Sequence, residues 1–386
     1  MSTPAKSNRT NEETEIKSAP KSGDEPQREA KQVLQLGFDW GTNTSCIQGS
    51  LRGSTELTVH HLVPTVVGYA KEGILPDLLP GNASVLFGQE ALKHRLHLRL
   101  VQPMIDGVLK DISVSRDYLQ YLKSLISVPA GTEIRAVIGI PANAAVTARE
   151  NVRQVVAGIF DRVILIPEPF LAALGFRGEN RLTDPNYVDP VRNSLFVDIG
   201  AGTTDVCLVQ GYYPTAEDQI SLPFAGDKVD AILSEGIKKT YPDCGLSTIK
   251  VREIKEQHSS VVAAEQPVIV NVMVGGKVRK LDLTEQIDFA CRSLLNQVFE
   301  ATKALIARAP SDSITELLQN IILTGGGSQI RQLDSELQRM LVEEGYEKPI
   351  VRSVGKNYKD FVAKGALKAA RQAREDQWQH LLRGQS

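Results

Sequence analysis

Two stretches of the chain carry the same order of residue types, and that order suits phosphate and a divalent cation. In residues 38–44 and 197–205, an apolar run ends in an aspartate, and a glycine-containing turn and hydroxyl side chains follow. Glycine lets backbone N–H groups approach phosphate oxygens, and threonine hydroxyls add donors. The aspartates, Asp39 and Asp198, repel phosphate, so we expect them to face Mg²⁺ through water, because this ion keeps much of its hydration shell. A single hairpin of this kind is more often an ordinary turn, but two matched copies indicate a pair that clamps a polyphosphate.

A run of three glycines at 325–327 is a third candidate. It follows residues 320–324, which predict a buried strand, and we expect a helix from about Ser328. Backbone without side chains can approach a flat adenine or ribose closely, and the N-terminus of the helix would favour the α-phosphate. Taken alone, an ordinary tight turn between a strand and a helix explains this run equally well.

The elements that must position these motifs predict an α/β protein with an internal duplication. The first half opens with a three-stranded meander, and the second half opens in the same way, at residues 33–39, 46–50 and 57–59 and at residues 194–200, 206–210 and 220–223. Further strands are expected at 136–140, 163–166, 268–274, 278–283 and 320–324, and helices at 90–99, 113–127, 145–160, 169–176, 229–240, 249–258, 284–308 and 358–382. Two α/β domains that each open with a meander follow from this pattern.

The chain divides into four predicted segments. They are a disordered polar tail at 1–31, a first domain at 32–190 with a small inserted subdomain at about 62–103, a second domain at 191–355 with an insertion at about 226–284, and a C-terminal helix at 356–386 that packs on the first domain. The tail has Ile16 as its one sizeable apolar group beyond Met1, so it cannot bury enough surface to offset the entropy of ordering. A solvated extension and an arm that binds a protein partner both fit this composition.

Composition excludes several classes of function. The net charge of −2 and the 5% of aromatic residues argue against a nucleic-acid partner, which requires a basic surface or a base-stacking platform. No apolar run reaches the roughly 20 residues that span a bilayer, and the N-terminus lacks a secretory apolar segment, so we expect a cytoplasmic protein without direct membrane insertion.

The spacing of cysteine and histidine gives no metal motif. The four cysteines form no CxxC pair, which predicts neither a disulfide framework nor a zinc site. His94 and His97 lie three residues apart on a predicted helix, but no third ligand is evident, and Arg95 beside them favours a solvated basic face.

The three motifs together resemble the superfamily that joins actin, the Hsp70 ATPase and the sugar kinases. The resemblance runs from about residue 33 to the C-terminus and implies an actin-like fold, a ribonuclease H-like duplication with two α/β domains around a nucleotide cleft. Within the superfamily the chain is most similar to bacterial actins, and above all to the MamK family of magnetosome filament proteins. The stretches that carry this similarity are 136–142, 168–170, 197–205, 325–331, 365–367 and Trp378.

The resemblance also implies roles for single residues. Asp39 and Asp198 would be the acidic groups near the metal, and Glu168 would orient or deprotonate the water that attacks the γ-phosphate. Glu168 follows a predicted strand, and Pro169 suits the first turn of the next helix; an acid that only stabilises the helix dipole is the alternative. The residues implied to hold the nucleotide are, at the phosphates, Gly41, Thr42, Asn43, Gly200, Ala201, Gly202, Thr203 and Thr204, and, at the adenosine, Gly325, Gly326, Gly327, Gln329, Lys255 and Glu256. For the last two, a charged helix face is an equal alternative.

The activity implied by the resemblance is slow hydrolysis of ATP with Mg²⁺, coupled to self-association into cytoskeletal filaments that organise an organelle such as the magnetosome. A nonfilamentous ATP-binding scaffold of the cell-division or pilus-assembly type and a small-molecule kinase stay open as alternatives. GTP is an open alternative to ATP, since a backbone-lined pocket accepts either purine. The polar tail is longer than expected for a bacterial actin and is the candidate site for a protein partner.

Overall fold

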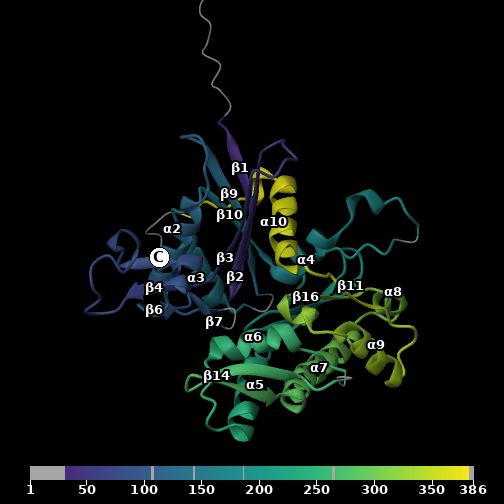
Figure 1. Ribbon diagram of the computed structural model, residues 1–386. Coiled ribbons are helices and arrows are strands. Elements are labelled where there is room, and N and C mark those ends of the chain that lie inside the picture. Colours follow the sequence, from purple (N-terminus) through teal and green to yellow (C-terminus); the bar gives the residue numbers. More distant parts are fainter. Residues whose placement is uncertain (1–30, 106–107, 142–143, 186, 263–265, 382–386) are drawn as a thin grey trace, which may run out of the picture. The chain divides into compact units, whose positions relative to one another are not determined.

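The computed structural model describes residues 31–105, 108–141, 144–185, 187–262 and 266–381. Contacts divide the chain into two units, Met1–Lys31 and Gln32–Ser386, and every helix and strand described below belongs to the second (Figure 1). The predicted tail lies outside the described residues apart from Lys31. Among the described residues, no helix is both long and apolar enough to cross a bilayer.

The first five-stranded sheet has the order β10-β9-β1-β2-β3. Its strands are β1 (Val33–Trp40), β2 (Thr44–Leu51), β3 (Val59–Pro64), β9 (Glu133–Ile140) and β10 (Arg162–Pro167). β1, β2 and β3 form an antiparallel meander, whereas β9 and β10 run parallel to β1. The predicted third strand, 57–59, is wrong in position, because Thr58 still bonds to Gly49 as part of the turn and the ladder begins at Val59.

The second five-stranded sheet repeats this topology in the order β13-β12-β11-β16-β17. Its strands are β11 (Ser194–Ile199), β12 (Thr204–Val209), β13 (Gln219–Leu222), β16 (Ile321–Thr324) and β17 (Val351–Ser353). Again the first three strands form an antiparallel meander and the last two run parallel to the first. The predicted duplication of two α/β halves is therefore confirmed.

Helices cover both faces of both sheets. One face of the first sheet packs against α2 (Ile112–Ser124) and α3 (Val146–Val156), and its other face packs against α10 (Phe361–Gln372), as Figure 1 shows. The helix α4 (Glu168–Phe176) joins α10 in an apolar layer that also contains Phe196 and Ile322 of the second sheet. The outer face of the second sheet packs against α5 (Gly226–Thr240), α6 (Thr248–His258), α7 (Thr284–Ile306), α8 (Ile314–Leu318) and α9 (Leu333–Glu343).

The two inner helices, α4 and α10, touch backbone to backbone. A Cβ added to Gly365 would lie 1.8 Å from the carbonyl oxygen of Leu171, and one added to Gly175 would lie 1.9 Å from that of Phe361. A Cβ on Gly37 of β1 would likewise collide with the backbone of α10 at Ala363. Glycine is thus required at these positions because no side chain fits between the crossing backbones.

Smaller elements extend from the two halves. Those of the first half are β4 (Val67–Ala70), η1 (Pro80–Asn82), β5 (Val85–Phe87), α1 (Gly88–Lys93), β6 (Leu98–Val101), β7 (Met104–Ile105), β8 (Val108–Leu109) and η2 (Glu179–Arg181). Those of the second half and the C-terminus are η3 (Ala216–Asp218), β14 (Ile269–Val274), β15 (Lys277–Asp282), η4 (Gly326–Gln329), η5 (Tyr358–Asp360) and η6 (Glu375–Gln377).

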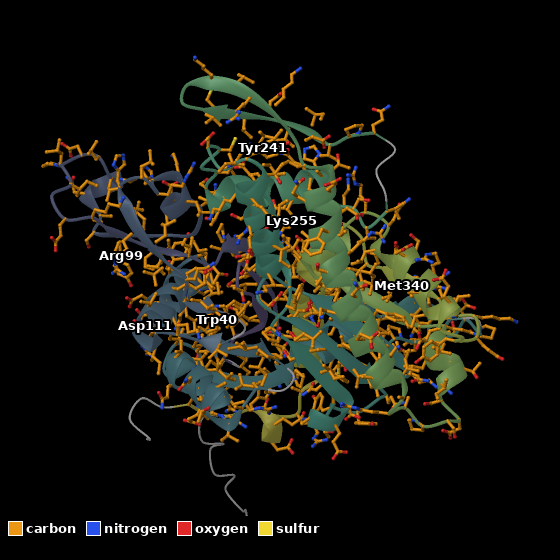
Figure 2. The ribbon with its side chains drawn as sticks, turned by 90° about the horizontal axis from the view of Figure 1, so that it is seen from below. Trp40, Arg99, Asp111, Tyr241, Lys255 and Met340 are labelled. Atoms are coloured by element: carbon orange, nitrogen blue, oxygen red, sulfur yellow. The ribbon has the colours of Figure 1, made fainter. Side chains whose placement is uncertain are left out.

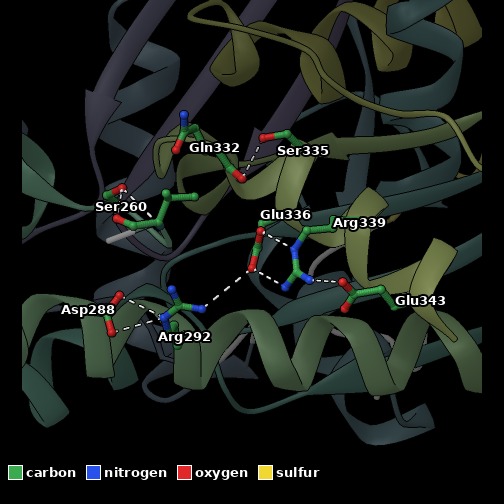
Figure 3. A network of polar contacts seen from close by, with 9 residues as sticks. Ser260, Asp288, Arg292, Gln332, Ser335, Glu336, Arg339 and Glu343 are labelled. Carbon is green, nitrogen blue, oxygen red and sulfur yellow. Dashed lines mark hydrogen bonds and ion pairs between the residues drawn. The ribbon is translucent and has the colours of Figure 1, made fainter. Parts of the chain in front are cut away.

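Ion pairs fasten α9 to α7 on the outside of the second half (Figure 3). Arg292 of α7 pairs with Asp288 of its own helix at 2.9 Å and with Glu336 of α9 at 3.7 Å. Arg339 closes the network by pairing with Glu336 at 2.8 Å and with Glu343. Side-chain hydrogen bonds from Arg339 lower the pKa of Glu336 below its ordinary value, so this carboxylate stays ionised and the network stays paired.

Several predicted helix boundaries are wrong. The helix expected at 90–99 ends at Lys93, because residues 98–101 pair with β4 as a strand instead. The helix expected at 145–160 ends at Val156, ahead of Gly158, which has a φ of 69°. The last helix, expected to reach 382, ends at Gln372, and Gln379 beyond it forms a bridge with Val163 of the first sheet.

Candidate functional site

The two predicted aspartates occupy the same place in the two sheets. Asp39 pairs with Cys46 across β1 and β2, and Asp198 pairs with Asp205 across β11 and β12. Each aspartate is therefore next to the turn that joins the first two strands of its meander. Because β9 and β16 run parallel to these first strands, the turns that follow β9 and β16 lie at the same edge of each sheet as the aspartates.

The turn between β11 and β12 is held from two sides. The N–H of Gly200 donates to the carbonyl of Thr203 at 2.9 Å, which closes the turn. From the start of α5, the N–H of Gly226 donates to the carbonyl of Gly200 at 3.1 Å and that of Asp227 to the carbonyl of Ala201 at 2.8 Å. Backbone hydrogen bonds thus fix the path of this turn, and its residues 200–203 line a cavity.

A cavity of about 400 Å³ lies between the two turns. It brings together Glu168 at the start of α4, Asp39 and Asp198, with most of the residues predicted for the nucleotide. The predicted residues in its lining are Gly41, Thr42, Asn43, Gly200, Ala201, Gly202, Thr203, Lys255, Glu256, Gly325, Gly326, Gly327 and Gln329. Residues from opposite ends of the sequence therefore share one site.

The structure does not place Thr204 in this lining. Thr204 is the first residue of β12, and its hydroxyl donates to the carbonyl of Phe224 at 2.7 Å inside the protein. Thr203, one residue earlier, does face the cavity, and its hydroxyl bonds to a carboxylate oxygen of Asp205 at 2.9 Å. Successive side chains of a strand point to opposite faces, so a shift of one residue turns Thr204 inward.

Acidic side chains dominate the electrostatics of the cavity. They are partly accessible from inside the cavity, yet the protein around them excludes most water. Burial, followed by the charge of Asp198, raises the pKa of Asp39 to about 8. Burial and then the charge of Asp205 raise the pKa of Asp198 to about 7. The pKa of Glu168 is raised well above its ordinary value by burial and then by the neighbouring aspartates. These carboxyl groups need a cation to ionise fully at neutral pH.

The donor set fits a hard divalent cation such as Mg²⁺. Asp39, Asp198, Glu168 and Asp205 all line the cavity and offer carboxylate oxygens, the ligands that Mg²⁺ prefers. One oxygen of the buried Asp205, Oδ1, has no hydrogen-bond partner, which is costly unless a water or a cation satisfies it. Room for Glu168 comes from Gly139, because a Cβ there would lie 2.8 Å from the Glu168 Cγ.

The triple glycine turn packs against the second aspartate. Gly325 has a φ of 77°, and a Cβ at this position would lie 2.4 Å from Oδ1 of Asp198 and 2.4 Å from the carbonyl of Ile199. The helix expected from Ser328 is instead a short 3₁₀ turn, η4, and α9 begins at Leu333. The turn therefore offers backbone to the cavity, but no α-helix N-terminus begins at that point.

The predicted base-binding segment forms a cavity wall. Figure 2 labels Lys255 on α6 and Trp40 on β1, which lie toward the middle of the described chain where its two halves meet. The ammonium group of Lys255 pairs with Asp230 at 2.8 Å and donates to the carbonyl of Gly226 at 2.9 Å. The protein therefore holds this side chain in place, next to Glu256 in the lining.

Sequence reasoning missed several of the residues that line the cavity. Asp205 directly follows the predicted phosphate motif, and Arg252 lies in the charged segment that contains Lys255, so both could have been found from their neighbours. Tyr358 and Lys359 of η5 also line the cavity. No sequence pattern identifies these two residues, because the contact between η5 and the turns forms only in the folded chain.

Arg252 connects the two halves at the cavity. Its guanidinium donates to Asp227 at 2.7 Å and to Asp230 at 2.9 Å, both in α5. It also donates to the side-chain oxygen of Asn43, in the first turn, at 3.4 Å. A cavity lined by two backbone-rich turns, buried carboxylates and cationic side chains can bind a polyphosphate with a divalent cation and position water beside it.

Comparisons with known proteins agree with this geometry. A family model described as MreB/Mbl protein matches residues 37–377. The actin-like protein MamK of Magnetospirillum gryphiswaldense is 33% identical over 314 residues, which are 80% of this chain and 82% of the relative.

Two solved structures are similar along nearly their whole length. A MamK double helical filament is 31% identical and has a TM-score of 0.78, over 89% of this chain and 100% of that chain. A non-polymerising MamK mutant bound to AMPPNP is 30% identical with a TM-score of 0.65, over 88% of this chain and 99% of that one. The actin-like fold is therefore confirmed.

Proposed function

Because the chain belongs to the MreB/Mbl family of actin-like proteins, we propose that it forms filaments, binds ATP with Mg²⁺ in the cavity between its halves and hydrolyses the nucleotide slowly. The observation that carries the proposal is the pair of matched turns facing buried carboxylates in one cavity. A solved relative bound to AMPPNP and another solved as a double helical filament support the two parts of the proposal.

The chain's own residues have defined roles in this proposal. Backbone and hydroxyl groups of the two turns hold the phosphates, and the triple glycine turn with α6 holds the adenosine. Asp39 and Asp198 would hold Mg²⁺, which would supply charge neutralisation for the phosphates. Glu168 orients the attacking water and accepts its proton, a role that requires the ionised carboxylate, and bound Mg²⁺ would favour that form against the burial that raises its pKa.

The filament would act as a cytoplasmic cytoskeleton that positions an organelle such as the magnetosome. This part of the proposal rests on the similarity to MamK along 80% of the chain. The tail, residues 1–31, would recruit a protein partner. Deletion of the tail should then leave nucleotide-dependent assembly unchanged and abolish recruitment in the cell.

High-speed sedimentation with negative-stain microscopy tests the proposal on the purified full chain. We expect the chain to enter the pellet as filaments with Mg²⁺-ATP and to stay in the supernatant without nucleotide. Phosphate release should require no acceptor other than water, which distinguishes this activity from that of a kinase. A chain that binds ATP but stays monomeric in every condition would contradict the filament and favour a scaffold.

A further inference from the structure

A second cluster of side chains of metal-ligating types lies at the edge of the nucleotide cavity, on the side of α10, and one of its members, Cys46, also lines the cavity. It consists of Cys46 on β2, His60 on β3 and Asp360 in η5. One ligand atom from each residue lies within 4.8 Å of the others. Cys46 pairs with Leu62 across the ladder and His60 with Gln48, so Cys46 and His60 lie on the same face of the sheet.

The contacts converge on one oxygen. Oδ1 of Asp360 lies 2.8 Å from Nε2 of His60 and 3.7 Å from Sγ of Cys46. Tetrahedral zinc with sulfur at ~2.3 Å and nitrogen or oxygen at ~2.1 Å implies ligand separations of about 3.4 to 3.6 Å. The sulfur–oxygen distance already matches, and the histidine ring needs to move by about half an ångström.

The orientation of Asp360 is a second, independent observation. Asp360 is the N-cap residue of α10, a position where a carboxylate commonly accepts from the first N–H groups of its own helix. Here its side chain makes no such capping bond and turns to the sheet instead. It also accepts a hydrogen bond from the amide of Gln48 at 3.3 Å.

We propose that Cys46, His60 and Asp360 form a binding site for Zn²⁺, with water or the side chain of Gln48 as fourth ligand. A thiolate, a carboxylate and a neutral imidazole balance the two charges of the ion. The thiol proton of Cys46 leaves to solvent when the Zn–S bond forms, as for every thiolate ligand. Cys46 is 1% exposed, whereas the side chains of His60 and Asp360 are 44% and 29% exposed, so the ion can enter from their side.

An ion bound at this site would hold one wall of the nucleotide cavity in place. Tyr358 and Lys359, the two residues before Asp360, line the cavity. A bound ion would tie η5 and the start of α10 to β2 and β3, and thereby restrict this wall. Sequence spacing could not reveal the cluster, because its third ligand comes from the far end of the chain.

Binding of Co²⁺ to the full chain tests the site. The reduced, chelator-treated protein is titrated with Co²⁺ in excess Mg²⁺, which occupies the carboxylates of the nucleotide cavity. We expect one equivalent with a thiolate-to-cobalt charge-transfer band, and displacement of the band by Zn²⁺. Loss of a second-shell partner typically weakens metal binding 10- to 100-fold, so His60→Gln and Asp360→Asn should weaken it at least about tenfold.

Two controls separate this result from background. In Cys46→Ala the band should vanish. In His61→Gln, whose side chain lies on the opposite face of β3, and in Cys207→Ala, in the second sheet, it should stay. Absence of the band in the wild type overturns the proposal. A Co²⁺ affinity that stays at the wild-type value in His60→Gln and Asp360→Asn also overturns it, because His60 and Asp360 would then form only an ion pair at the surface. Because the test needs neither ATP nor filaments, its failure is distinct from failure of the proposed function.

Discussion

At the scale of single residues, the cavity is marked by carboxyl groups that lie close together and are largely shielded from water. Glu168 begins α4 directly after β10, and Gly139 of the neighbouring strand leaves space for its side chain. The same crowding that raises its pKa also raises the pKa values of Asp39 and Asp198. The same small group of carboxyl groups therefore dominates the charge of the cavity.

Replacement of Glu168 should separate binding from hydrolysis. We expect Glu168→Ala to lower the rate of phosphate release by roughly 10²–10⁴-fold, because general acid–base catalysis contributes about this much. Nucleotide affinity should change little, since the phosphates are held by the turns. The comparison is Glu150→Ala, an exposed carboxylate of α3. An unchanged rate of phosphate release in Glu168→Ala would remove this residue from the mechanism.

The raised carboxyl pKa values predict how stability depends on pH. Between the ordinary value of 3.8 and the raised values of about 7 and 8, the folded protein holds protons that the unfolded chain has lost. The free energy of unfolding without metal should therefore fall as the pH rises from about 4 to about 8. Mg²⁺ should reduce this slope, because it favours the ionised carboxylates.

Thermal unfolding across this pH range, with and without Mg²⁺, measures the effect. Asp39→Asn should flatten the slope of the metal-free protein. A midpoint that rises with pH in the absence of metal, or a slope that Mg²⁺ leaves unaltered, would contradict this account.

The limits of sequence reasoning are visible at single positions. Asp39 and Asp198 could be predicted, because their motifs are local and repeated. Thr204 lies outside the cavity lining because it is the first residue of β12 and its hydroxyl bonds to Phe224, and one residue along a strand reverses the direction of a side chain. Tyr358 could not be predicted, because only tertiary packing brings η5 to the cavity.

At the scale of elements, the layer of α4 and α10 sets how closely the two sheets approach. Its glycines allow a backbone contact that larger residues would prevent. The central strands of the two sheets could be predicted, since the short apolar runs of β9 and β16 are local signals, whereas β17 and the small strands β4 to β8 were not predicted. The end of α10 was missed, because pairing of Gln379 with Val163 outcompetes further helix.

Gly365→Ala should destabilise the protein although alanine favours helix. Alanine gains up to ~1 kcal/mol in an open helix, but its Cβ would lie 1.8 Å from the carbonyl oxygen of Leu171. Forcing the helices apart should cost at least about 2 kcal/mol. Denaturant unfolding gives the value, with Gly245→Ala as control, because no heavy atom lies within 4 Å of a Cβ there. A neutral effect at Gly365 would show that the layer is less tightly packed than described.

At the scale of the whole molecule, the side chain of Arg252 reaches across the cavity. It holds α5 of the second half and contacts Asn43 of the first. The arrangement of the halves around a cleft could be expected from the resemblance to actin-like proteins. The particular residue that bridges them could not, since it depends on how closely the turns approach.

Arg252→Ala should speed nucleotide release. Loss of hydrogen bonds to charged groups and to Asn43 costs about 1–2 kcal/mol, which is roughly a 5- to 30-fold change in the equilibrium. Stopped-flow displacement of a fluorescent nucleotide measures the rate. Lys250→Ala, on the exposed side of the same helix, is the matched control. Equal rates in the two variants would mean that the contact with Asn43 does not retain the nucleotide.

The return of α10 to the first sheet has a consequence for how the chain could be divided. The chain builds the first sheet, crosses through residues 178–193, builds the second sheet and then comes back. The returning segment is anchored, because Gln35 donates to the carbonyl of Ala370 at 2.7 Å and Glu375 pairs with Arg52 and Arg135. If the chain were cut after Leu182, the first fragment would hold the first sheet without α10, and the second fragment would hold the second half together with the α10 that the first sheet needs. A nick there would break the chain while noncovalent complementation kept the molecule whole.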